Sequence, residues 1–157
     1  MSLSKPHPMY EHAVTNYQVN KCVTVARLLS GRFRTSSLLR HFYPDKFSGL
    51  CELCHKEHED VPHIILPKCN ILKDKVATLC NYARDTFTNC RAAAVFKNVI
   101  IMGKDDELKV QFLLDPSVVP QVIAAVQIDK SVLPELFKVT TTWCYSLVRA
   151  RKKLLEA

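Results

Sequence analysis

The sequence predicts a mainly α-helical protein: a small helical domain with a zinc-knuckle-like insertion and no extended sheet. Three observations lead to this fold class. Apolar residues recur at helical spacing along most of the 157 residues. The chain has only three glycines, and each stands at a boundary between predicted elements. A short segment rich in Cys and His, residues 51–69, interrupts the helical pattern.

Two helices are predicted before that segment. Residues 17–30 place seven apolar side chains on one broad face. Gly31 follows, at the position where a residue in the left-handed conformation commonly ends a helix. Thr35 or Ser36 can cap a second, short helix, which Pro44 ends.

Further helices are predicted after the Cys-rich segment. They cover residues 71–87, 91–102, 105–115, a stretch from about Pro120 to Gln127, and a long stretch from about Pro134 to Leu155. The apolar residues of 105–115 also alternate in part as they would in a strand. A helix is favoured there because no partner strand is evident elsewhere.

The chain divides into three predicted regions: a flexible N-terminus at 1–16, helices plus the metal-binding module at 17–88, and a helical region at 89–157. No apolar run reaches the roughly 18 residues that a membrane-spanning helix needs. The first residues also lack the apolar core of a signal peptide. We therefore expect an intracellular protein, in the nucleus or the cytoplasm, that is not secreted and does not bind a membrane.

The Cys-rich segment has the spacing of a zinc site, Cys51-x2-Cys54-x8-His63-x5-Cys69. Zinc takes four nitrogen or sulfur ligands in a tetrahedron, and Cys-x2-Cys supplies two of them from one tight turn. Closely spaced cysteines in a reducing compartment indicate a metal sooner than a disulfide. Because the protein would fill all four positions, we expect one structural Zn²⁺ and no zinc catalysis.

Two alternatives to this ligand set stay open. His55 or His58 could replace His63, although His58 stands between two glutamates whereas apolar neighbours would hold His63 in place. The cysteines could also be inert buried residues without a metal. The remaining four cysteines occur singly on apolar helical faces and are predicted to be core residues: Cys22, Cys80, Cys90 and Cys144.

The charge is distributed unevenly, which predicts a polyanionic partner such as RNA or DNA. Residues 1–50 carry seven Lys or Arg and two acids, and residues 149–157 carry four and one. The predicted nucleic-acid-binding residues are Arg27, Arg32, Arg34, Arg40 and Lys46. Arg binds phosphate through its planar fork, and the aromatic side chains among these cations can stack on unpaired bases.

The C-terminal cations are predicted to be the solvated end of the last helix, where positive charge suits the helix dipole. They are Arg149, Arg151, Lys152 and Lys153. The alternative is that they extend the basic surface.

Several motifs occur together along the chain: residues 31–35 (Gly-Arg-Phe-Arg-Thr), the Cys-Cys-His-Cys cluster with the run 62–66 (Pro-His-Ile-Ile-Leu), and the runs 111–116 and 140–146. Together they resemble the zinc-binding region downstream of the polymerase in non-LTR (LINE-type) retrotransposon reverse transcriptases, in particular those of fish-type elements. The resemblance covers about residues 18–155. It implies Cys51, Cys54, His63 and Cys69 as ligands, although the family usually has four residues, not five, before the last Cys.

The resemblance implies a function: a zinc-binding, nucleic-acid-associated C-terminal module of a much larger reverse transcriptase, without catalytic activity of its own. Asp105-Asp106 has no flanking strands, so it does not resemble the paired aspartates of a polymerase. No endonuclease signature, nucleophile elbow or Gly-rich phosphate loop occurs, so we expect neither an enzyme nor a small-molecule substrate. The alternatives are a zinc-stabilised protein-interaction module and an expressed retroelement remnant with no present activity.

Overall fold

The computed structural model describes residues 16–66 and 68–156, so the predicted flexible terminus lies outside the described residues apart from Asn16. The helices are α1 (Asn16–Leu29), α2 (Ser36–Phe42), α3 (Val61–Ile65), α4 (Lys73–Thr86), α5 (Cys90–Phe96), the π-helical turn η2 (Lys97–Ile101), α6 (Asp106–Leu114), the 3-10 turn η3 (Pro116–Val118), α7 (Pro120–Ile128) and α8 (Val132–Glu156). The described residues contain no strand, and extended segments pair only in an isolated bridge between Leu50 and His58. The mainly α-helical prediction is confirmed.

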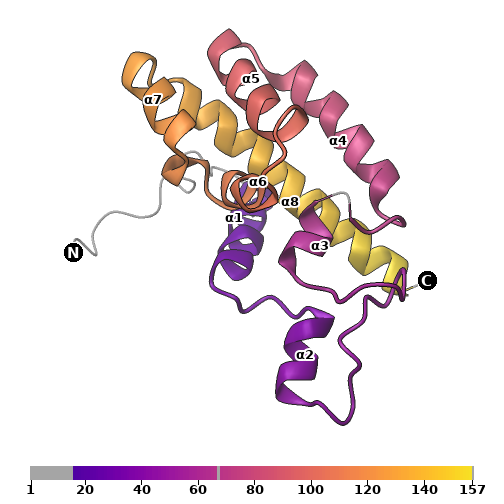
Figure 1. Cartoon of the computed structure of the whole chain (residues 1–157). Coiled ribbons are helices and arrows are strands. Elements are labelled where there is room, and N and C mark those ends of the chain that lie inside the picture. Colours follow the sequence, from indigo (N-terminus) through magenta and orange to yellow (C-terminus); the bar gives the residue numbers. More distant parts are fainter. Residues whose placement is uncertain (1–15, 67, 157) are drawn as a thin grey trace, which may run out of the picture.

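Helix α8 is the centre of the fold (Figure 1). It contacts α1, α3, α4, α5, α6 and α7, while α2 lies at the periphery. On α8, Trp143 is buried and its indole Nε1 donates a hydrogen bond to the carbonyl of Ile65 in α3, 2.9 Å away. Phe96 lies edge-on to the Trp143 ring, with 6.2 Å between centroids. One apolar core therefore ties the metal-ligand region to the last helix.

The predicted helix ends agree with local backbone chemistry. Gly31 has a φ of 71°, the left-handed conformation expected after α1. The Thr35 hydroxyl accepts a hydrogen bond from the amide of Leu38, 3.1 Å away, and so caps α2. Asp105 caps α6 in the same way. These contacts confirm the expected cap at Thr35 and the helix at 105–115.

Two expectations need correction or refinement. Residues 91–102 were expected to form a single helix, but α5 continues as the π-helical turn η2 before Gly103. A Cβ atom at Gly103 would lie 2.2 Å from the carbonyl oxygen of Val99, so the wider turn requires glycine there. The prediction of a core position is wrong for Cys90, which begins α5 and is exposed, because the buried face of this helix is formed by Ala92, Val95 and Phe96.

The two predicted folded regions, 17–88 and 89–157, both contribute to the surroundings of α8. Helices α1, α3 and α4 pack on it from the first region, and α5, α6 and α7 from the second. Their buried apolar side chains belong to one cluster. Among the helices that the structure describes, none combines the length and the apolar character needed to cross a membrane.

Candidate metal centre and basic groove

Four side chains from the Cys-rich segment meet at one point. The ligand atoms of Cys51, Cys54, His63 and Cys69 all lie within 4.8 Å of one another. Cys51 Sγ is 4.0 Å from Cys69 Sγ, and Cys54 Sγ is 3.5 Å from His63 Nε2. Cys51, His63 and Cys69 are buried and Cys54 is half-buried. The four residues could hold a metal ion between them.

These distances suit a small tetrahedral ion. Around zinc, with Zn–S bonds of about 2.3 Å, neighbouring ligand atoms are about 3.8 Å apart. The separations of 4.0 and 3.5 Å lie on either side of that value. No disulfide joins these sulfurs, since a disulfide would hold them about 2.05 Å apart, and every cysteine is free. The donor set therefore fits a metal better than it fits cross-linking.

The first two ligands come from a tight backbone loop. The amide of Cys51 donates to the carbonyl of Glu57 at 2.8 Å, and the amide of Glu59 donates to the carbonyl of Gly49 at 3.0 Å. Between these contacts the chain reverses at His55, whose φ is 56°. Gly49 has a φ of 81°, and a Cβ there would lie 2.9 Å from Cδ of Arg40. The loop thus requires glycine at its entrance.

His63 is positioned by the start of α3. Asp60 caps this helix, since its Oδ1 accepts a hydrogen bond from the His63 amide at 2.9 Å. Pro62 occupies the first turn, where its missing amide hydrogen costs nothing. The imidazole then points its Nε2 at Cys54. Cys69 returns from the turn before α4, where its carbonyl accepts from the amide of Leu72 at 3.1 Å.

The pKa values of the two loop thiols, Cys51 and Cys54, are shifted in opposite directions. Burial is the largest influence on Cys51 and raises its pKa to about 12, although the amides of Cys54 and Leu53 act in the other direction. Burial would also raise the pKa of Cys54, but hydrogen bonds from the amides of Lys56 and Glu57 outweigh it and lower that pKa to about 7. Amides that donate to a sulfur stabilise the thiolate, which is the form that binds metals.

The second ring nitrogen of His63 faces a carboxylate. Nδ1 is buried and has no hydrogen-bond partner among the described residues. Oε2 of Glu57 lies 3.4 Å away but is not aligned for a hydrogen bond. A metal on Nε2 would leave the proton on Nδ1, where carboxylates commonly orient metal-binding histidines.

The other histidines of the segment lie outside the cluster. His55 and His58 are both exposed, and neither belongs to the group of ligand atoms that lie close together. Their positions follow from the loop, which turns at His55 and places His58 in the bridge opposite Leu50. His63 is therefore the histidine that the fold brings to the three cysteines.

Sequence reasoning missed a buried ion pair behind the loop. Glu59 is only 1% exposed, and its Oε1 and Oε2 accept hydrogen bonds from Nη2 and Nε of Arg151 at 2.6 and 2.9 Å. The amide of Ser36 donates to the same carboxylate at 3.0 Å, and Cys51 Sγ lies 3.6 Å away. Burial would raise the pKa of Glu59, but Arg151 and Ser36 lower it, so the carboxylate is ionised.

This pair corrects the expectation that Arg151 is solvated at the end of the last helix. Its side chain is 13% exposed, and its guanidinium also lies over the Phe33 ring, 5.7 Å from the centroid. Glu59 and Arg151 are 92 positions apart. No local spacing pattern could reveal a contact between residues so far apart in the sequence.

Seven basic residues, Arg151 among them, line a groove of about 820 Å³ between α1 and α8. Its cationic lining is Arg27, Arg32, Arg34, Arg149, Arg151, Lys152 and Lys153, against a single acid, Glu156. We call this set of residues the basic groove. The structure thus brings together two basic segments that are far apart in the sequence, and it includes three of the five predicted nucleic-acid-binding residues. Among the described side chains, only Arg151 of these cations forms an ion pair.

The remaining two predicted contacts lie elsewhere. Arg40 is exposed, and its Nη1 donates a hydrogen bond to the carbonyl of Ser48 at 2.8 Å. This contact lies just before Gly49, where the loop that carries Cys51 and Cys54 begins. Lys46 is exposed in the turn after α2 and does not line the basic groove. Both residues belong to the peripheral part of the molecule around α2.

The fold and the site define a class: a mainly α-helical protein with a Cys₃His cluster that could hold a metal ion and a basic groove beside it. Comparison with protein-family models, with curated proteins and with solved structures finds no match to this chain.

Proposed function

We propose that this protein is a zinc-stabilised module that binds nucleic acid and has no catalytic activity of its own. Three sulfurs and one imidazole suit Zn²⁺, because hard cations such as Mg²⁺ and Ca²⁺ take oxygen ligands. All four tetrahedral positions would be filled by protein, so the ion would hold the loop and α3 together. The ligands would be Cys51, Cys54, His63 and Cys69.

The observation that carries the nucleic-acid part is the composition of the basic groove. Seven cations line it against one acid. Cations without ion-pair partners attract polyanions, since binding neutralises phosphates and releases their counterions. Phe33, with Arg151 over its ring, and Tyr145 also line the groove, and bases can stack on aromatic side chains.

Within this proposal, the chain is the C-terminal zinc-binding module of a non-LTR retrotransposon reverse transcriptase. The support is that the four residues implied by the family resemblance are those that meet in the Cys₃His cluster. Sequencing the transcript upstream of this chain tests the assignment. A continuous reading frame with the paired-aspartate polymerase motif would support it, and a transcript that starts at this chain would oppose it.

The binding proposal is tested by salt titration of the zinc-loaded full chain with fluorescent oligonucleotides. Replacing Arg32→Gln and Arg34→Gln together should weaken binding to all sequences alike. The slope of log affinity against log salt should fall by about 1.4 for two lost contacts to a single strand. The double variant Arg84→Gln with Arg91→Gln removes the same charge outside the groove and should retain the slope.

A second candidate function is a protein-interaction module, favoured by two exposed aromatic side chains on and after α2. Phe42 is 65% exposed and Tyr43 is 55% exposed. If the wild-type chain fails to bind any oligonucleotide at low salt, the nucleic-acid proposal is wrong and this candidate takes its place.

A further inference from the structure

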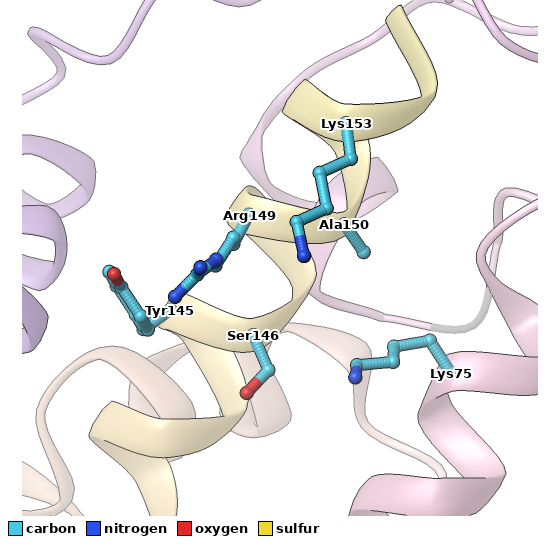
Figure 2. A pocket seen from close by; sticks show the side chains of 6 residues that line it. All are labelled: Lys75, Tyr145, Ser146, Arg149, Ala150 and Lys153. Atoms are coloured by element: carbon cyan, nitrogen blue, oxygen red, sulfur yellow. The ribbon is translucent and has the colours of Figure 1, made fainter. Parts of the chain in front are cut away.

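A second hollow, of about 280 Å³, lies beside the basic groove on the side of α8 that faces α4. Figure 2 shows its lining, with Lys75 extending from α4 toward Ser146, and Lys153 reaching into the same space from α8. Arg149 extends toward Tyr145. Two ammonium groups and a hydroxyl therefore converge between the two helices, an arrangement that suits a phosphate oxygen.

The two hollows are adjacent. Tyr145, Arg149 and Lys153 line both of them. Within the described part of the chain, no acidic side chain forms an ion pair with Lys75, Arg149 or Lys153. The shared residues thus link the cations beside α1 to those of α8 and to Lys75 of α4.

We propose that a single nucleic-acid strand follows this surface, crossing α8 at Tyr145 and Arg149 and placing a phosphate between Lys75 and Lys153. This inference rests on the proposed nucleic-acid function and specifies its ligand and path. A duplex is stiff over about 150 base pairs, so a duplex that followed the surface around α8 would have to be bent, at a cost in free energy. A single strand is flexible and avoids that cost. Aromatic side chains along the path can stack only on unpaired bases.

The crossing makes the contribution of Lys75 depend on strand length. An oligonucleotide of about four nucleotides can occupy the basic groove alone, whereas one of about 16 can extend into the second hollow. Lys75→Gln should therefore leave binding of the short strand unchanged. It should weaken binding of the long strand several-fold and lower its salt slope by about 0.7. Arg149→Gln, which alters both hollows, should weaken both strands.

The experiment uses fluorescence anisotropy with the zinc-loaded full chain and oligo-dT and oligo-U strands of both lengths. Lys138→Gln is the matched control, because Lys138 is exposed on α8 but lines neither hollow. Circular dichroism checks that each variant folds, as expected for Lys75, which is exposed and forms no described side-chain bond. Tighter binding of one strand type would identify RNA or DNA as the ligand within the same path.

The outcomes separate the two proposals. If the wild-type chain binds neither strand, the proposed function fails. If it binds, but Lys75→Gln binds the long strand with wild-type affinity and slope, only the crossing path is wrong. Equal affinity for a duplex and a single strand of the same length would also overturn the path, because a duplex would have to bend to reach both hollows.

Discussion

Nη2 of Arg151 lies 2.6 Å from Oε1 of Glu59, which joins the end of the last helix to the loop that carries the first two candidate ligands. The same carboxylate contacts Cys51 Sγ at 3.6 Å. Arg151 lines the basic groove as well. A single buried ion pair therefore connects the candidate metal centre to the surface proposed to bind nucleic acid.

Breaking this pair should be costly. Arg151→Met leaves the Glu59 carboxylate buried with only the Ser36 donors and the Cys51 thiol beside it, and removing one partner of a buried pair costs about 3–5 kcal/mol. Denaturant unfolding followed by circular dichroism measures the loss. The double variant Arg151→Met with Glu59→Gln should lose less than the sum of the two single variants. The exposed Lys138→Met, on the same helix, should change stability by less than about 0.5 kcal/mol. A similarly small change for Arg151→Met would contradict the structural role of the pair.

Metal removal should unfold the loop. Purified protein is expected to contain about one zinc per chain, and chelation should lower helicity and the midpoint of thermal unfolding, because structural zinc sites supply folding energy directly. Cys69→Ser should abolish zinc binding, since Cys69 is a buried member of the cluster. Cys90→Ser is the control, because Cys90 is exposed and lies outside the cluster. Atomic emission gives the metal content. If the purified protein contained no zinc and chelation left its thermal stability unchanged, the proposed metal site would be contradicted.

The choice of histidine can be tested separately. His63→Ala should reduce zinc affinity strongly, because it removes one of four ligands and opens a position to water. His55→Ala and His58→Ala should bind zinc as the wild type does, since both histidines are exposed and outside the cluster. Competition with a chromogenic zinc chelator measures the three affinities. A loss confined to His58→Ala would transfer the ligand role to that residue.

The single tryptophan supplies a test of the contact between α8 and α3. Trp143→Phe keeps most of the apolar volume but orphans the buried carbonyl of Ile65, which costs about 1–3 kcal/mol. Trp143→Ala adds a cavity and should cost about 3–5 kcal/mol. Denaturant unfolding followed by circular dichroism measures both. Ile128→Ala, at a side chain that is 68% exposed, should be nearly neutral. Equal stabilities of the Phe variant and the wild type would show that the hydrogen bond contributes nothing net.

The sequence alone determined the local features of this protein. Helix α1 ends at Leu29 before Gly31, α2 is capped by Thr35, and α6 forms at 105–115 largely as expected. Such features depend on residues within one or two helical turns of each other, so their spacing is visible in the chain. The Cys-x2-Cys turn is local in the same sense. His63 and Cys69 lie in the same short segment of the sequence and complete the cluster.

Only the tertiary structure decided which charges are paired and which are available. Arg151 was expected to be solvated, yet it forms a buried pair with Glu59 across 92 positions. Arg40, a predicted nucleic-acid contact, lies outside the basic groove and donates a hydrogen bond to the carbonyl of Ser48. Whether a charged side chain is paired or exposed depends on what the fold places beside it. A charge can be buried only when a partner offsets the free energy of lost hydration. The basic groove has the same origin, because it exists only where α8 brings the end of the chain against α1.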